Sequence, residues 1–407
     1  MNSQKSINPI VPRALPGFAQ HVNRNLSFRI APNAIHAILD GSDISRVEML
    51  DHFVQLVLER SQAPFFINKA MHRGRDGEEG YGVPNSSDPV ARELASRLTV
   101  LMSAIGALYP SNPNPHRLCS APHLELLWNT FLEHPIRVYQ GDSSIFMRNG
   151  RVRLDAAEQY NDFIALLRQR LTEERQLKSS LHNWSWGSRE NVANLKIYLD
   201  NLFDKYGSVT VLHLRLSAAT TPIGVKSTSV DESQYYFDLL RKSRACFFDR
   251  IRRKPALFTN EPEYVWSIIP LVDGTYELHL TLLFSTVALQ KVLDDKRVEA
   301  NLTGTPCANH ADQVGAYWIA VGTEGRGSYR QSDQIPGVYD PDVWVHGVIH
   351  ADETSRRKSL VDALSYLALR RTLIRLASEP LGKYFGFPER KPRRSRRSAG
   401  GRANSAG

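Results

Sequence analysis

One short segment of the chain carries two side chains of the kind that bind metal ions. Polar residues and leucines alternate over Tyr276–Leu282, as they do in a β-strand, where successive side chains point to opposite faces. Glu277 and His279 therefore share one face of the expected strand. A carboxylate oxygen and an imidazole nitrogen, joined by further oxygen ligands, suit Mg²⁺ or Mn²⁺. The plainer interpretation is a half-exposed strand whose polar face meets solvent.

A second candidate group is the phenol of Tyr366, which lies within an apolar helical pattern. A tyrosine beside a bound metal ion could attack a phosphodiester as a nucleophile. Arg370 and Arg371 follow one helical turn later and would neutralise phosphate charge. The alternative is a tyrosine that only packs at a helix interface.

Basic residues gather at the C-terminus of the chain. The formal net charge is +9, but seven Lys and Arg residues and no acid lie between positions 390 and 402, including Arg393, Arg394, Arg396 and Arg397. Without those seven, 44 basic residues face 42 acidic ones, so the rest of the chain is nearly neutral. We expect a disordered basic tail that binds polyanions by counterion release. A solvated terminus without a dedicated partner is the alternative.

The first half of the chain reads as mainly helical. Residues 1–40 are irregular, and a capping-box pattern from Ser45 to Glu48 predicts a helix start. Apolar spacing predicts further helices over 90–108, 122–132 and 155–178, and Asn149-Gly150 predicts a hairpin turn. The segment Asn183–Gly187 interrupts the helical pattern. We therefore expect a helical domain over 41–185 and a second domain over 190–386, followed by the tail at 387–407.

The second half mixes strands with long helices. Strands are expected over 209–216, 264–271, 276–284, 317–321 and 344–350, and helices over 191–206, 233–254, 287–300 and 354–376. The helix over 233–254 has one apolar side and one basic side, which includes Arg241 and Arg244. The pattern predicts an α+β protein with an antiparallel sheet in its C-terminal domain.

Composition excludes several classes of protein. Apolar residues at 42% and charged residues at 23% are ordinary for a globular chain, so wholesale disorder and fibrous repeats are excluded. Three scattered cysteines favour a reducing compartment. No apolar run is long enough to span a bilayer and no signal peptide is visible. We expect a cytoplasmic protein without a membrane partner.

The motifs of the second half occur in an order that resembles one protein family. The chain is similar to the gene-two-type replication proteins of filamentous phages (inoviruses) and their bacterial prophage relatives. These proteins belong to the HUH (His-hydrophobic-His) endonucleases that start rolling-circle replication. The resemblance covers about residues 195–376, and the matching pieces are Leu202–Leu216, Tyr264–Trp266, Glu277–Phe284, Val345–His350 and Ser365–Ala368.

The resemblance implies a ferredoxin-like sheet with a metal site and a tyrosine nucleophile. It assigns His279 to the second motif histidine and Tyr366 to the nucleophile, with Glu277 at the position of the first histidine. This chain departs from the pattern at further positions. Ile269 and Leu369 replace an expected glutamate and lysine, and Arg215 replaces an acid on the first strand.

The expected function is that of a replication-initiator-like protein in a bacterial cytoplasm. Its partners would be single-stranded or hairpin DNA and replication proteins of the host. If it cleaves DNA, Tyr366 would attack a phosphodiester while Glu277 and His279 hold Mg²⁺ or Mn²⁺. Two alternatives stay open: a catalytically inactive relative that only binds nucleic acid, and a host protein-interaction factor that acts through residues 1–185.

Overall fold

The structure is a computed structural model of the 407-residue chain. It describes the following residues: 41–59, 62–68, 80–98, 101–102, 104–105, 118–119, 121–147, 150–173, 175–219, 230–270, 275–304, 309–331, 346–373, 375–376 and 379–388. The predictions for residues 1–40 and for the tail from 389 onward lie outside this part of the chain.

The N-terminal half is mainly helical, as predicted. Its helices are α2 (Gly41–Glu59), α3 (Pro89–Ser96), α5 (Pro122–Glu133) and α6 (Leu154–Glu173), beside a small sheet of β1 (Phe65–Asn68), β2 (Tyr81–Pro84) and β4 (Val152–Arg153). Helix α2 begins four residues before Ser45, so the expected capping box is not the helix start. The predicted turn at Gly150 is supported by an antiparallel bridge between Phe146 and Val152.

Helix α7 (Arg175–Tyr206) corrects one sequence-based expectation. It runs without interruption through Asn183–Gly187, where the pattern predicted a break. Tertiary contact explains the continuity, because Trp184 donates its indole N–H to the carbonyl of Thr372 at 2.7 Å. The expected domain boundary therefore lies inside a helix. One buried apolar cluster includes side chains from both sides of it, among them Phe53 and Leu199.

The C-terminal half is built around an antiparallel sheet. Its central strands are β5 (Ser208–Ser217), β7 (Tyr276–Ser285) and β6 (Glu263–Pro270), and β11 (Phe385–Gly386) pairs with the outer side of β6. The other side of β5 pairs with β9 (Gly347–His350) at its start and β8 (Ser328–Gln331) at its end. This agrees with the predicted α+β class.

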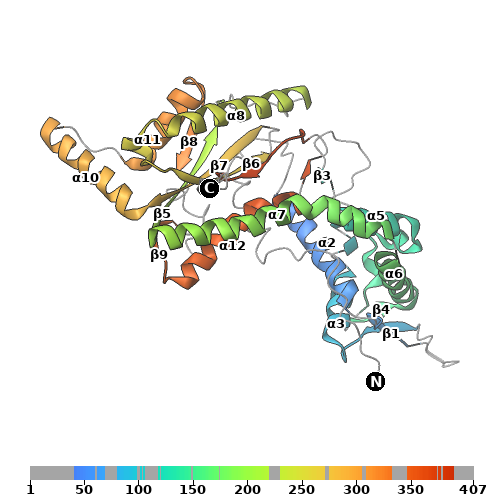
Figure 1. Cartoon of the computed structure of the whole chain (residues 1–407). Coiled ribbons are helices and arrows are strands. Elements are labelled where there is room, and N and C mark those ends of the chain that lie inside the picture. The colour runs from blue at the N-terminus through green and yellow to red at the C-terminus, as the bar shows by residue number, and fades with distance from the viewer. Residues whose placement is uncertain are drawn as a thin grey trace, which may run out of the picture.

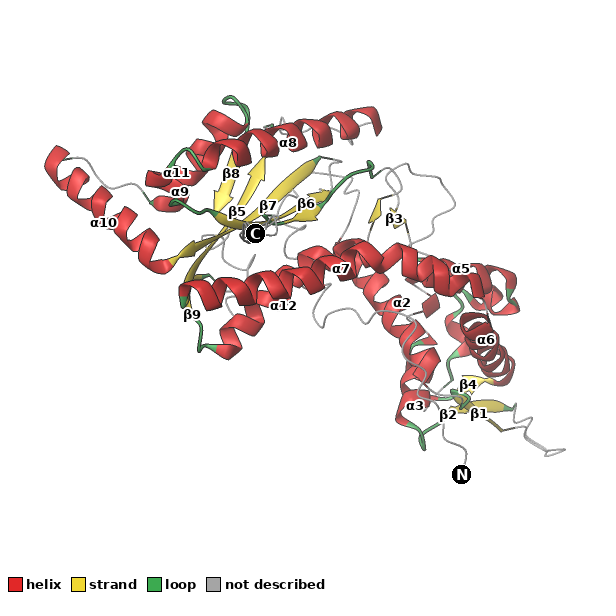
Figure 2. Cartoon of the chain, in the orientation of Figure 1, coloured by secondary structure: helices red, strands yellow, loops and turns green. Residues whose placement is uncertain are grey.

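Helices cover both faces of the sheet (Figures 1 and 2). On one side lie α8 (Val230–Ile251), α9 (Pro255–Phe258) and α11 (His310–Tyr317), and on the other lie α7 and α12 (Thr354–Leu373). Leu278, Leu280 and Leu282 of β7 face the α8 side and form a second apolar core with Phe237 and Phe247. Helix α10 (Thr286–Thr303) extends outward from the end of β7 (Figure 1). The polar residues of β7 consequently face the α7–α12 side.

The strand predicted over 317–321 is wrong. These residues complete α11 and a short π-helix at Trp318–Gly322. Asn309 caps α11 by accepting the N–H of Ala311, and the indole of Trp318, which is fully buried, donates to the carbonyl of Ser217. A short apolar run fits a buried helix as well as a strand, and the cap decides between them here.

In the part of the chain that the structure describes, no helix is both long and apolar enough to cross a membrane.

Candidate functional site

Glu277 and His279 lie together on one face of β7, as predicted, but they are buried rather than half-exposed. A third side chain joins them, because Arg215 of β5 pairs across the sheet with His279. Nε and Nη2 of Arg215 both lie 2.6 Å from Oε2 of Glu277, and Nε2 of His279 lies 3.3 Å from the same oxygen. Arg215 and Glu277 are each 1% exposed. We call these three residues the Arg215 cluster.

The Arg215 cluster does not offer the ligands that Mg²⁺ or Mn²⁺ needs. It has two metal-binding side chains, and two nitrogens of the guanidinium engage Oε2 of Glu277. A divalent cation placed there would be repelled by Arg215 at close range in a poorly screened interior. Within the described residues no three His, Cys, Asp or Glu side chains are grouped as metal ligands. Arg215 is the positive charge that the structure places beside Glu277.

The cross-strand neighbours of this cluster differ between its two sides. Ile269 lies directly opposite Glu277 in the β6–β7 ladder, and Arg215 lies opposite His279 in the β5–β7 ladder. The cluster therefore has an apolar neighbour on β6 and its basic member on β5.

Helix α12 brings the predicted nucleophile segment to the same face of the sheet. Ser267 of β6 lies opposite His279, and its hydroxyl donates to the carbonyl of Leu367 at 3.5 Å. Tyr366 therefore lies on the helical turn that contacts the sheet beside His279. The side chains of Tyr366 and Arg370 are outside the described part of the structure.

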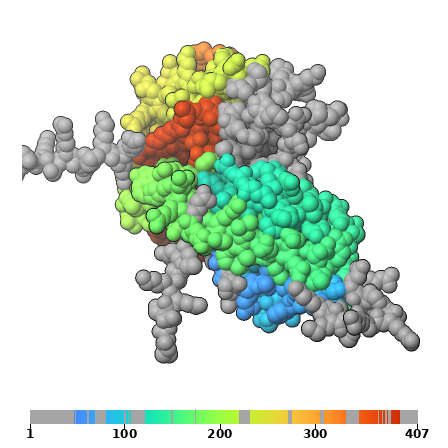
Figure 3. Space-filling view, turned by 90° about the vertical axis from the view of Figure 1, so that its right-hand side faces the viewer, coloured from blue at the N-terminus to red at the C-terminus, as the bar shows by residue number. Residues whose placement is uncertain are grey.

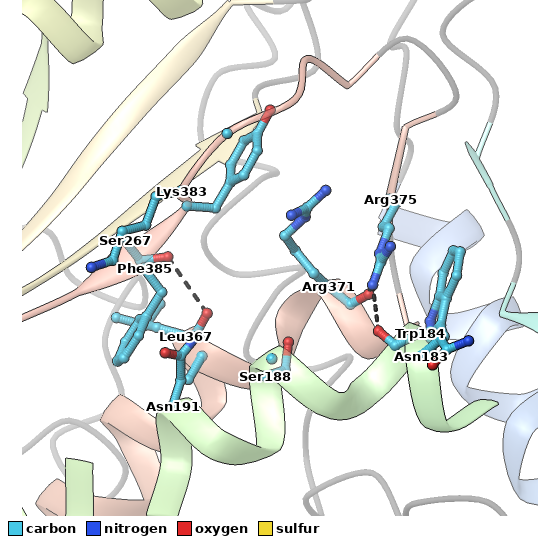
Figure 4. A pocket seen from close by; sticks show the side chains of 14 residues that line it. Asn183, Trp184, Ser188, Asn191, Ser267, Leu367, Arg371, Arg375, Lys383 and Phe385 are labelled. Atoms are coloured by element: carbon cyan, nitrogen blue, oxygen red, sulfur yellow. Dashed lines mark hydrogen bonds between the residues drawn. The ribbon is translucent and has the colours of Figure 1, made fainter. Parts of the chain in front are cut away.

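A pocket of about 290 Å³ opens between α7, α12 and the segment that precedes β11. Ser267 lines it together with Leu367 and Ala368, so the pocket reaches the sheet next to His279. Figure 4 shows Arg371 between the wall that contains Ser267 and the wall formed by Trp184 and Arg375. The polar and charged lining residues are Asn183, Ser188, Asn191, Ser267, Arg371, Arg375 and Lys383.

The basic groups of this pocket are held in place by aromatic rings and carbonyls. The guanidinium carbon of Arg375 lies 3.7 Å from the ring centroid of Trp184, and its Nε donates to the carbonyl of Arg371. Arg371 lies 4.3 Å over the ring of Tyr384, and its Nε is 3.4 Å from the buried carboxylate of Glu379. Lys383 is exposed at the rim. Arg371, Arg375 and Lys383 therefore bring three positive charges to the pocket, and the carboxylate of Glu379 lies beside the first of them.

The stacked arginines continue along the edge of the sheet onto α8. Tyr384 stacks on Phe237 with ring centroids 4.8 Å apart, and Arg241 lies over the other ring of this pair, 5.6 Å from the centroid of Phe237. Further along, Arg244 lies 3.8 Å over the ring of Trp266. We call the set of Arg241, Arg244 and Arg371 with their rings Phe237, Trp266 and Tyr384 the arginine–aromatic edge.

Among the arginines of this edge, Arg244 has the positive charge that nearby negative groups balance least. Burial, reinforced by repulsion from Arg241, lowers the pKa of its guanidinium to about 10, so it keeps its proton at neutral pH. Its Nη1 is buried and has no hydrogen-bond partner among the described residues. An arginine in this state is stabilised when an anion approaches. Figure 3 shows the C-terminal segment, in red, at the surface between the yellow region that includes α8 and the green α7.

Other residues named from the sequence lie elsewhere. His350, which ends the matching piece Val345–His350, is exposed on β9 opposite Ser208, whereas the Arg215 cluster lies seven residues further along β5, so His350 does not reach it. The arginines of the tail, including Arg393 and Arg397, lie outside the described residues. Trp184, Lys383 and Tyr384 were not anticipated. Their aromatic and basic types are the signal, but only folding brings residues about 200 positions apart together.

No protein-family model, curated protein or solved structure matches this chain.

Proposed function

We propose that this chain is a DNA-binding protein of the replication-initiator type, which holds a DNA strand by its phosphates along the arginine–aromatic edge. The carrying observation is that three arginines of this edge lie over buried aromatic rings. A guanidinium stacked on a ring loses little further freedom when it binds a phosphate, because its plane is already fixed. The edge therefore favours a polyanion over a neutral partner.

Strand binding without cleavage is the form of this function that the Arg215 cluster supports best. Oε2 of Glu277 is engaged by two nitrogens of Arg215, whose positive charge disfavours a divalent cation at the same carboxylate. The buried cluster instead holds β5 and β7 against each other. The edge of the same sheet presents the arginines of the arginine–aromatic edge. This corresponds to the inactive nucleic-acid-binding alternative among the expectations from sequence.

The test of this proposal is charge reversal on α8. Arg241→Glu should weaken the binding of a fluorescently labelled single-stranded oligonucleotide by about tenfold at moderate salt, because one phosphate contact becomes a repulsion. Arg241 suits the experiment because its side chain is exposed and its ion pair with Asp238 is long at 3.5 Å. Fluorescence anisotropy measures the dissociation constant.

The matched control for this experiment is Lys291→Glu on α10, which makes the same change of charge at an exposed site on the outward-pointing helix. It should leave the affinity within about twofold, since only the long-range field changes. Equal losses in both variants would show that net charge, and not the arginine–aromatic edge, governs binding.

Strand cleavage by Tyr366 is the second candidate, favoured by the contact of α12 with the sheet beside His279. The phenol oxygen would attack phosphorus, the bond to the 3′-oxygen would break, and the 3′-oxygen would leave with a proton, giving a 5′-phosphotyrosine. Labelled single-stranded DNA should then remain on the denatured protein, and Tyr366→Phe should abolish this adduct while DNA affinity stays unchanged. A wild-type protein that binds DNA but forms no adduct, with or without Mn²⁺, would reject cleavage.

A further inference from the structure

The pocket between α7 and α12 has the features of a site for one small anionic group. Its volume of about 290 Å³ lies at the small end of ligand sites, which range from roughly 300 to 1,000 Å³. None of its lining residues is acidic in the part of the chain that the structure describes. Arg371, Arg375 and Lys383 supply positive charge, and Ser188 and Asn191 supply neutral hydrogen-bonding groups.

The charge balance of the pocket matches a phosphate group. Glu379 lies beside Arg371 and offsets part of its charge, whereas the residues that line the cavity itself include three basic side chains and none that is acidic among the described residues. Arg375 is fixed from two sides by the ring and the carbonyl oxygen of Trp184. Guanidinium groups held in this way suit the oxygens of a phosphate, which accept several hydrogen bonds at once.

We propose that this pocket binds the phosphate of a single nucleotide unit, with the adjoining sugar and base in the remaining volume. This inference rests on the proposed DNA-binding function and adds to it a discrete site. The arginine–aromatic edge would hold the strand by several phosphates, and the pocket would take one unit of it. Arg371 belongs to both, because it lines the pocket and stacks on Tyr384. The same chemistry is offered by a free nucleotide, which the experiment separates from a strand.

Calorimetric titration of the full chain with deoxythymidine monophosphate, inorganic phosphate and thymidine tests the proposal. The two phosphate-containing probes should bind and thymidine should not. Lys383→Glu should weaken the binding of deoxythymidine monophosphate by about tenfold or more, since an attraction at the pocket rim becomes a repulsion. Lys383→Arg should keep most of the affinity, and Lys291→Glu on α10 should have no effect.

A second variant blocks the pocket without a change of charge. Gly187 lines the pocket within α7, and a Cβ built there meets no atom within 4 Å. Gly187→Leu therefore places its Cβ in open space and adds an apolar side chain at the pocket, and it should not lower stability because leucine favours a helix over glycine. It should weaken the binding of deoxythymidine monophosphate as strongly as Lys383→Glu does.

The outcomes separate this inference from the proposed function. If no phosphate probe binds, or if both pocket variants bind like the wild type, the pocket is not a phosphate site. Single-strand binding that still depends on Arg241 would then leave the proposed function intact. Competition of the monophosphate with a labelled strand, lost in Gly187→Leu, would assign the site to a strand. Monophosphate binding without any strand binding would overturn that assignment and support a free-nucleotide site.

Discussion

Replacing Glu277 by glutamine should lower the free energy of unfolding by about 3–5 kcal/mol, because Arg215 would remain buried without its charge partner. Both side chains are 1% exposed, and two nitrogens of Arg215 lie 2.6 Å from one oxygen of Glu277. Glutamine keeps the volume of the side chain but not its charge, so the loss is electrostatic. Denaturation in urea, followed by circular dichroism, measures it.

Two controls make this prediction specific to the buried pair. Asp249→Asn removes a carboxylate from the exposed ion pair with Arg253 and should cost less than about 1 kcal/mol. The double variant Arg215→Met/Glu277→Leu removes both charges and should recover most of the stability lost in Glu277→Gln, since apolar pairs often replace buried ion pairs without loss. A cost below 1 kcal/mol for Glu277→Gln would show that the pair contributes little.

Strand alternation made the face shared by Glu277 and His279 predictable, because side chains on a strand repeat every two residues whatever the fold. Their burial and their partner were not predictable. The alternation of β7 is the same for a solvated polar face and for a polar face covered by α7 and α12. Arg215 lies 62 positions before Glu277 in the chain. Only the register between β5 and β7 brings Arg215 opposite His279.

The pocket between α7 and α12 could not be predicted from the sequence for a related reason. Asn183–Gly187 contains residues with low helix propensity, and from sequence it indicated a break. In the fold, contacts of Trp184 with Thr372 and Arg375 hold this segment in α7 and create one wall of the pocket. Local propensity decided the expectation, whereas tertiary contact decided the structure. Arg371, which the sequence singled out as a candidate for phosphate binding, lines this pocket, and its role there stays a prediction.

Deleting residues 390–407 should produce the largest loss of DNA affinity. The deleted segment contains seven basic residues and no acid, so it can displace up to seven counterions from a DNA strand. For single-stranded DNA, the slope of log K against the logarithm of the salt concentration should then become less steep by up to about 5. The dissociation constant should rise by roughly 10³-fold or more at low salt, and by much less at high salt. Anisotropy titrations over a series of salt concentrations measure both quantities.

The type of charge in the tail gives the matched control. Changing Arg393, Arg394, Arg396 and Arg397 to lysine keeps every charge and should leave the slope of log K against log salt unchanged. Changing the same four residues to glutamine should make that slope less steep by about 3. Because the tail would act through phosphates alone, its deletion should weaken all DNA sequences equally. Arg241→Glu should then add its own loss to that of the deletion, since two contacts without shared partners act independently. An unchanged salt dependence after deletion would mean that the folded part of the chain, with its nearly balanced charge, binds DNA through the arginine–aromatic edge alone.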